Sequence, residues 1–293
     1  MTEKQRKIIT CILAMIFVVS TALFVFRAVD TAKGANSYKS AEEIAARPRE
    51  EQKVTEQVTE PVAEEMLPKE PDAADPEPTE PPVVWVVAPV EEDEHMKTLK
   101  KINLEALREV NPDVVGWIFA PNCRINYPIL QGEDNEYYLN RTWEKRVNVA
   151  GSIFMESTNS PDFTDFRTIL YGHNMADTSM FGSLYRYESP VSLKGSPYVY
   201  LVTDEGVLRY EIYSSYKADV ESETYVLNLN SEARRAAFIQ MTKDEAFFDT
   251  GITPAVTDRL LTLSTCAGGE TTRRVVHARL PMIQLETKTD APQ

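Results

Sequence analysis

Three side chains that could form a nucleophilic site occur at the ends of apolar runs in this sequence. Cys266 ends the run Leu261–Cys266, and Arg273 begins another run seven residues later. His173 follows an apolar run far upstream. A cysteine attacks as its thiolate, which a nearby cationic or basic group favours, and acyl transfer also needs a donor for the developing oxyanion. The three residue types together therefore predict nucleophilic catalysis at a carbonyl.

A single cysteine at the end of a strand is more often a small buried hydrophobe than a nucleophile. The chain has three cysteines, too few for a disulfide framework. Cys11 lies in a long apolar run, so only Cys123 could pair with Cys266. We expect both to be free thiols, with Cys123 structural, because a nucleophile must stay reduced.

The chain also has three histidines, and two of them compete with His173 for the role of base. His95 lies at the start of a predicted helix, away from any strand end. His277 shares a strand face with Arg273, but four residues of strand separate them by about 13 Å. We therefore expect His173 to be the functional histidine.

Short strands must position these residues. The loop Ala267–Gly269 is brief, so the runs before and after it are predicted to be adjacent antiparallel strands, with Cys266 and Arg273 facing each other at the open end of the hairpin. Many such runs separated by turns predict a mainly β fold, a barrel or a sandwich. The predicted strands are 114–119, 125–130, 151–156, 168–171, 198–203, 208–217, 260–266 and 274–284.

Helices are predicted at three places in the same region. Apolar residues recur at helical spacing from Met96 to Val110, where Asn111-Pro112 stops the helix. Residues 134–139 indicate a short helical turn that places Asn135 and Leu139 on one face. A longer helix over 231–248 begins at the N-cap Ser231, just before the cysteine strand.

The sequence before this domain divides into three parts. Residues 1–7 are short and basic, and the 19-residue uncharged run 8–26 ends at Arg27, so 8–27 is predicted to be a transmembrane signal-anchor helix with a cytoplasmic N-terminus. A cleaved signal peptide is the alternative. Residues 28–94 are acidic and proline-rich and predict a disordered extracellular linker, which could reach up to roughly 200 Å if extended. Residues 95–288 form the predicted catalytic domain.

Charge and composition exclude some partners. Most of the net charge of −14 belongs to the linker, and the rest of the chain shows no basic stripe, so a nucleic-acid partner is not expected. The linker contains an apolar island, Val83–Val87, which is interpreted as a strand packed on the domain, with a docking patch for a partner or the membrane as the alternative. The sequence has no metal-binding or phosphate-loop motif.

The motifs resemble those of class B sortases, the cysteine transpeptidases of Gram-positive surfaces. The cysteine signature Thr262–Cys266 with an Arg-led strand and the histidine segment 171–175 carry the resemblance. It extends over about residues 96–285 and includes Asn-Pro-Asp followed by Val-Val-Gly-Trp at 111–117, Tyr-Pro at 127–128, Asp134–Leu139 and Met180–Leu184. The Cys-to-Arg loop is shorter than the family pattern.

The resemblance implies a fold and a set of site residues. The fold would be an eight-stranded β-barrel with flanking N-terminal helices and a helix before the cysteine strand, without a metal or other cofactor. Cys266 would be the nucleophile, His173 the general acid and base, and Arg273 the oxyanion and substrate-positioning group. The implied substrate-binding residues are Asn135, Leu139, Ser264 and Ala267.

The resemblance also implies a reaction at the cell membrane. The enzyme would cleave a C-terminal sorting motif of secreted proteins after threonine, through a thioester, and transfer them to an amine of peptidoglycan. Its catalytic domain would be extracellular, and its partners would be the sorting-motif proteins, the peptidoglycan amine and the membrane. The alternatives are a sortase that polymerises pilin, a plain cysteine protease, and a non-catalytic stalked barrel that binds wall or peptide ligands.

Overall fold

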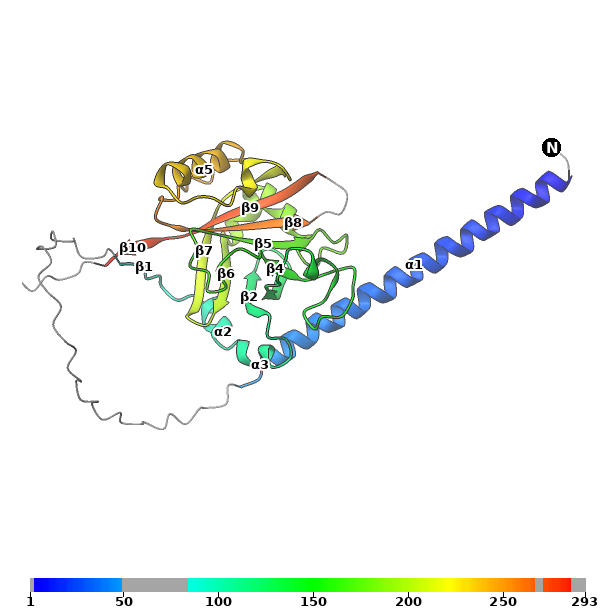
Figure 1. The fold of residues 1–293 in the computed structure, drawn as a ribbon, viewed down its shortest axis with the longest axis horizontal. Helices are drawn as coiled ribbons and strands as arrows, with labels where there is room; N and C mark the ends of the chain where they lie inside the picture. The colour runs from blue at the N-terminus through cyan, green and yellow to red at the C-terminus, as the bar shows by residue number, and fades with distance from the viewer. Residues whose placement is uncertain (1–2, 49–83, 267–270, 286–293) are drawn as a thin grey trace, which may run out of the picture.

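A computed structural model describes residues 3–48, 84–266 and 271–285, and for Cys266 the description is limited to the backbone. Among these residues eight strands close into a barrel in the order β2-β3-β4-β5-β8-β9-β7-β6, as the resemblance implies (Figure 1). The strands are β2 (Val114–Ala120), β3 (Ile125–Leu130), β4 (Ile153–Met155), β5 (Arg167–His173), β6 (Tyr198–Thr203), β7 (Gly206–Asp219), β8 (Arg259–Cys266) and β9 (Thr272–Leu280).

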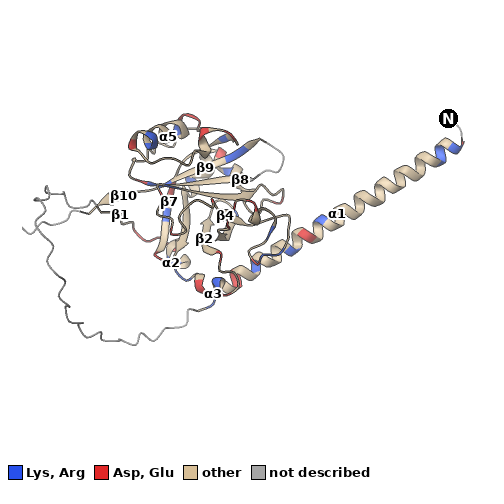
Figure 2. Ribbon diagram, in the orientation of Figure 1, with Lys and Arg blue, Asp and Glu red and all other residues tan. Residues whose placement is uncertain are grey.

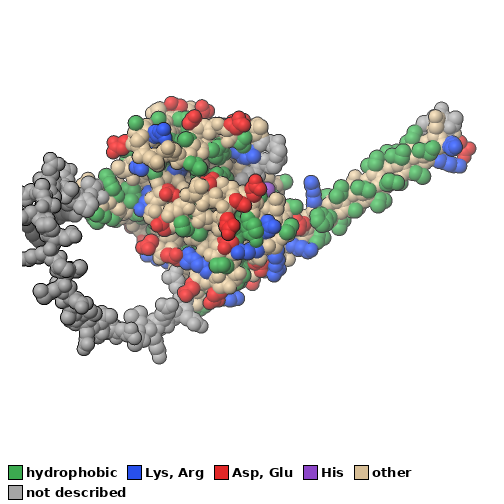
Figure 3. Space-filling view, viewed as in Figure 1, with side chains coloured by type: hydrophobic (Ala, Val, Ile, Leu, Met, Phe, Trp, Pro, Cys, Tyr) green, Lys and Arg blue, Asp and Glu red, His purple; other side chains and the backbone are tan. Residues whose placement is uncertain are grey.

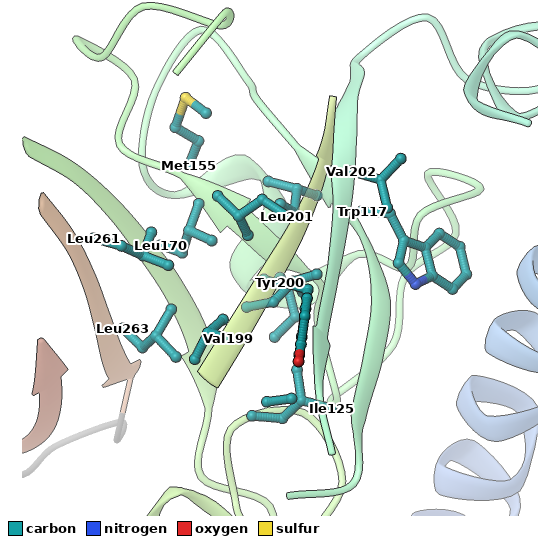
Figure 4. Close-up of a cluster of buried hydrophobic side chains, with 14 of the residues drawn as sticks. Trp117, Ile125, Met155, Leu170, Val199, Tyr200, Leu201, Val202, Leu261 and Leu263 are labelled. Carbon is teal, nitrogen blue, oxygen red and sulfur yellow. The ribbon is translucent and has the colours of Figure 1, made fainter. Parts of the chain in front are cut away.

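The barrel interior is filled by apolar side chains from every second position of its strands. Figure 4 shows Leu261 and Leu263 of β8 pointing towards Leu170, Val199 and Leu201, and all five are buried. Because strand side chains alternate between two faces, the intervening residues of β8 lie on the outer face of the barrel. The predicted alternation of this strand therefore places Thr262 and Ser264 outside the barrel core.

The prediction of one continuous helix from Met96 to Val110 is wrong. The structure has two short helices, α2 (Glu94–Leu99) and α3 (Leu104–Arg108), and Asn103 caps the second by accepting a hydrogen bond from the Ala106 amide. An asparagine side chain competes for backbone donors and so favours a new N-cap over a continued helix. The break leaves Val110 exposed.

The helix before the cysteine strand agrees with its prediction. Helix α5 (Glu232–Asp244) is shorter than the predicted 231–248, and Ser231 caps it by accepting from the Arg234 amide. It packs over the outer face of the barrel through Phe238 and Ile239. The remaining short helices are η1 (Tyr137–Asn140), η2 (Leu184–Glu188), α4 (Pro190–Gly195) and η3 (Glu223–Tyr225).

The apolar island forms a strand, as its first interpretation predicted. β1 (Trp85–Val87) pairs antiparallel with β10 (Met282–Gln284) in a small second sheet. The predicted strand 274–284 is accordingly divided into β9 and β10 at Pro281. The sheet joins the two ends of the described domain on the side of the barrel away from the N-terminus (Figure 1).

The N-terminal helix is much longer than the predicted membrane anchor. Helix α1 runs from Glu3 to Ala45, and its apolar part is long enough to cross a membrane, with none of that part buried. Its last turns pack on the barrel through Tyr38, Ala41 and Ile44. Residues 28–45 were predicted to belong to a disordered linker, and the structure shows them as helix instead, because this stretch has its own apolar face for the domain to cover. Residues 49–83 of the predicted linker lie outside the described residues.

Candidate active site

The pairing of β5 with β8 brings two of the predicted catalytic positions together. The two strands run parallel, and their last paired positions are His173 and Cys266. Two neighbouring parallel strands end at the same edge of a sheet. The side chains of residues that are paired in register project from the same face. Two residues that are 93 positions apart in the sequence thus become direct neighbours at one end of the barrel.

The hairpin of β8 and β9 brings Arg273 to the same end. The strands are antiparallel, as predicted, and Ser264 pairs with Val275. Continuing that register by two positions sets position 266 opposite Arg273. In Figure 2 the basic colour at the start of β9 lies beside the end of β8.

The neighbouring arginine has a different environment. The Nε of Arg274 donates to Glu188 Oε1 over 2.6 Å, and its side chain is mostly buried in that ion pair. Arg273 and Arg274 lie on opposite faces of the strand, since side chains alternate. Arg273 therefore lies on the strand face away from the ion pair of Arg274 with Glu188.

A cavity of about 560 Å³ opens at this end of the barrel. Five of the predicted site residues line it, and they come from four separate parts of the chain. Asn140, Phe154, Glu156, Tyr171, Val220, Tyr225 and Leu227 complete its lining together with Asn135, Leu139, His173, Ser264 and Arg273. The sequence-based selection therefore identified residues that share one cavity. Ala267 lies outside the described residues.

His173 is half-buried in the cavity wall and bound to the main chain. Its Nε2 lies 2.7 Å from the carbonyl oxygen of Leu139. Because a carbonyl oxygen only accepts, Nε2 carries the proton and Nδ1 is the acceptor nitrogen of the neutral ring. Burial lowers the pKa of His173 below its ordinary value, against the opposing effect of the Leu139 carbonyl. The ring is therefore mostly neutral near pH 7 and able to accept a proton.

A buried carboxylate, Glu156, fixes another part of the cavity lining. Both oxygens of Glu156 accept from Asn135 Nδ2 at 2.8 Å, and one also accepts from the Tyr171 hydroxyl at 2.9 Å. Asn135 Oδ1 accepts from the Ser157 amide, so the Asn135 side chain is held at both ends. Burial opposes ionisation of Glu156, but these hydrogen bonds outweigh it, and its pKa lies below the ordinary value. The result is a fixed anionic group in the cavity lining that orients Asn135.

A further part of the lining comes from the segment between β7 and α5. The hydroxyl of Tyr225 lies 2.8 Å from Ser264 Oγ, and Val220 and Leu227 add apolar surface. Arg167 secures the same segment, since its guanidinium donates to the carbonyls of Thr224 and Val226. Extended ligands such as peptides need a groove with apolar walls and a few fixed polar groups, and this cavity provides both.

The competing histidine and cysteine are both structural in this fold. His277 is fully buried, with Nδ1 3.0 Å from Thr262 Oγ1 and Nε2 3.1 Å from the Tyr216 hydroxyl. Cys123 is buried against the Ser183 carbonyl, and burial raises the pKa of its thiol to about 11. Neither is accessible to a substrate, which agrees with the sequence interpretation.

Sequence reasoning did not select Glu156, Tyr171 or Tyr225. Tyr171 could have been found, because it lies two residues before His173 on the same strand and therefore on the same face. Glu156 and Tyr225 give no such signal, since only the closed barrel and the β7–α5 segment bring them to the cavity.

Comparison with known proteins gives consistent matches. A family model described as the sortase domain matches residues 118–281. Sortase B of Staphylococcus aureus is 33% identical over 174 residues, which are 59% of this chain and 71% of that protein. Sortase B of Listeria monocytogenes is 34% identical over 166 residues, which are 56% of this chain and 66% of that protein.

Solved structures show the same likeness in three dimensions. A Staphylococcus aureus sortase B–substrate complex superposes with a TM-score of 0.58 at 31% identity, covering 62% of this chain and 85% of that one. The crystal structure of sortase B from B. anthracis in complex with AAEK1 gives a TM-score of 0.62 at 27% identity, covering 86% and 98%. Residues 118–281, which the family model matches, include all the residues that line the cavity.

Proposed function

Because this chain belongs to the sortase family of cysteine transpeptidases and is similar to sortase B, we propose that Cys266, His173 and Arg273 are its catalytic residues. The observation that supports this assignment best is the register of β5 with β8, which pairs His173 with the cysteine position. A nucleophile beside a base, with a cation opposite, is the arrangement that acyl transfer requires.

The first step forms an acyl-enzyme. The Cys266 sulfur attacks the carbonyl carbon of a peptide bond, and the carbonyl oxygen becomes an oxyanion that Arg273 stabilises through its N–H donors. The thiol proton passes to Nδ1 of His173, since Nε2 is engaged with Leu139. The resulting imidazolium protonates the departing amine as the carbon–nitrogen bond breaks, which leaves a thioester on Cys266.

The second step reverses these proton transfers. An incoming amine gives a proton to the neutral His173 ring and attacks the thioester, and the cysteine leaves as thiolate. The new amide bond joins the substrate to the acceptor and restores the enzyme. The proposed substrate is a secreted protein with a C-terminal sorting motif, cleaved after threonine, and the proposed acceptor is a peptidoglycan amine.

The cavity supports a peptide substrate. Asn135, which Glu156 holds, and the Tyr225–Ser264 pair offer fixed polar contacts, while Leu139 and Leu227 offer apolar ones. We assign Asn135, Leu139 and Ser264 to peptide binding, together with the main chain at Ala267. The apolar part of α1 anchors the enzyme in the cell membrane, with the catalytic domain outside.

Turnover of sorting-motif peptides by the full-length chain in detergent, with and without an added amine, tests this function. We expect an amide product that requires the amine and that disappears in Cys266→Ala. Trapping the thioester with hydroxylamine identifies the acyl-enzyme directly. Product formation that continues in Cys266→Ala would exclude the mechanism, and hydrolysis that exceeds transfer at high amine concentration would favour a protease.

A further inference from the structure

One contact of α1 with the barrel lies next to the catalytic cavity. The main-chain oxygen of Asp30 accepts from Asn148 Nδ2 at 2.6 Å, and its carboxylate accepts from the Val149 amide at 2.9 Å. The Asn148 amide in turn donates to the carbonyl of Asn140, a residue that lines the cavity. The loop 140–149 therefore joins the cavity wall directly to the helix.

This contact is tight over several turns of the helix. A Cβ added at Gly34 would come within 2.7 Å of the Asn148 side chain, so the helix backbone lies against the loop. Further along, the Tyr38 hydroxyl donates to the carbonyl of Gly151. A Cβ added at Gly151 would clash with the Leu139 carbonyl, which binds His173. The helix, the loop and the catalytic histidine thus form one packed unit.

The same contact lies very close to the end of the apolar segment. The uncharged run ends at Arg27, and Asp30 is three residues further along the helix, a rise of about 5 Å. A bilayer has a hydrocarbon core of about 30 Å and headgroup layers that add about 5–8 Å on each side. When the apolar run spans the core, Asp30 and the loop bound to it therefore lie at the level of the headgroups.

The surface at this level combines exposed apolar and basic side chains. Val147 is 76% exposed and Val149 is 42% exposed, and Lys33 and Arg146 line one hollow beside them. We call Arg27, Lys33, Arg146, Val147 and Val149 the headgroup-facing surface. Two acids lie among them, and each has a partner: Asp30 accepts from the Val149 amide, while Glu144 accepts from Ser37 and lies 3.6 Å from Arg146. Exposed valines beside cations suit the boundary between lipid headgroups and hydrocarbon.

The orientation of the barrel agrees with this placement. In Figure 1, β8 ends and β9 begins on the side towards which α1 projects, whereas β1 and β10 lie on the opposite side. Figure 3 shows hydrophobic side chains along the projecting part of α1 up to the point where it meets the domain. Burial of that part in a bilayer brings the cavity end of the barrel to the membrane.

The predicted linker does not set the distance between membrane and domain. The Arg47 carbonyl accepts from Asn103, and the Val84 carbonyl accepts from the Leu285 amide, so both residues that flank this part of the chain lie on the domain. The length of residues 49–83 therefore has no effect on how far the barrel stands from the span.

We propose that the headgroup-facing surface rests on anionic phospholipid headgroups and holds the catalytic cavity at the bilayer. The proposal rests on the membrane anchoring proposed above. The recognised ligand is the lipid surface itself, with phosphate groups beside Lys33 and Arg146 and the two valines at the acyl boundary. The enzyme then meets those substrates and acceptors that are themselves held in the membrane.

Site-specific fluorescence on the full-length chain tests the proposal. The background Cys11→Ser with Cys266→Ser leaves the buried, weakly acidic Cys123 as the remaining thiol, and a bimane label is attached at Val147→Cys. The matched control carries the label at Ile283→Cys, which is 42% exposed on β10 at the far side of the barrel. The proteins are reconstituted in vesicles of phosphatidylglycerol and phosphatidylcholine that contain a lipid with a nitroxide on its headgroup.

We expect the label at position 147 to be quenched several-fold more strongly than the label at position 283. We also expect Lys33→Glu with Arg146→Glu to reduce quenching at 147. Equal quenching at both positions in vesicle-inserted protein would overturn the proposal, and so would quenching at 147 that the two charge reversals leave unchanged. If the protein does not float with the vesicles in a density gradient, the proposed membrane anchor is refuted instead. Because the background lacks the nucleophile, none of these outcomes depends on catalysis.

Discussion

Two histidines on the outer face of one barrel have opposite surroundings. His173 ends β5, lies half-buried in the cavity wall and binds the Leu139 carbonyl through one nitrogen. His277 lies in the middle of β9, fully buried, with both nitrogens hydrogen-bonded. The comparison shows that the position along the strand decides which histidine reaches the cavity.

The side chains that cover the middle of the sheet explain why His277 is fully buried and His173 is only half-buried. The Tyr216 ring stacks on His277 at a centroid distance of 5.3 Å, and Phe238 of α5 packs edge-on at 5.8 Å. Helix α5 and its flanking segments thus exclude water from the strand centres, while the strand ends open into the cavity. Burial lowers the pKa of both rings, and that of His277 falls to about 3.

The largest expected effect comes from replacing His173, the residue proposed as general acid and base. His173→Gln retains a donor for Leu139 but cannot shuttle a proton, so we expect kcat/KM to fall by about 10²–10⁴-fold. The melting temperature should change little. Peptide transfer assays measure kcat/KM of this variant and of the matched control His277→Gln. Comparable losses of kcat/KM in the two folded variants would remove the functional distinction between the histidines.

Arg273 and Arg274 allow a similar comparison between the two faces of strand β9. Arg273→Ala should lower kcat/KM by about 10²–10³-fold, because one oxyanion donor is lost. Arg274→Ala removes the ion pair with Glu188 on the other face and should leave kcat/KM nearly unchanged. Steady-state kinetics on both variants test whether Arg273 is the oxyanion donor. A larger loss of kcat/KM in Arg274→Ala than in Arg273→Ala would assign that role to Arg274 instead.

The buried histidine should matter for stability. His277→Ala leaves the Thr262 and Tyr216 hydroxyls without this partner and opens a cavity, which should lower the free energy of unfolding by about 2–4 kcal/mol. Urea denaturation measures the change, with the exposed His95→Ala as control. A loss in His277→Ala no larger than the loss in His95→Ala would contradict the structural role.

The smallest expected effect is a pH dependence of stability. The pKa of His277 is about 3 in the fold and 6.5 in its ordinary state, so between these values only the unfolded chain binds the proton. Stability from the neutral ring is complete above pH 6.5 and declines as the pH falls, by about 1.4 kcal/mol per pH unit. The difference in unfolding free energy between the native chain and His277→Gln should therefore narrow from pH 7 to pH 5. A constant difference would show that the ring does not remain neutral.

Local patterns predicted many of the secondary-structure elements. The alternation in Leu261–Cys266 and the N-cap at Ser231 depend on neighbouring residues only, so the strand and α5 could be predicted from the sequence. The helix from Met96 to Val110 was predicted as continuous because its apolar spacing is regular, but the capping preference of Asn103 broke it. The limits of α1 were also missed, since packing on the barrel stabilises its last turns.

The sequence by itself determined the strand alternation, the apolar N-terminal segment, and the motifs that selected Cys266, His173 and Arg273 as candidates. Only the tertiary structure decided that β5 lies in parallel register beside β8, that Glu156 and Tyr225 face the same cavity, and that α1 docks beside the loop 140–149. The physical reason is that alternation and capping are set by residues a few positions apart. Strand order and burial depend on contacts between distant segments, which form only when the barrel closes.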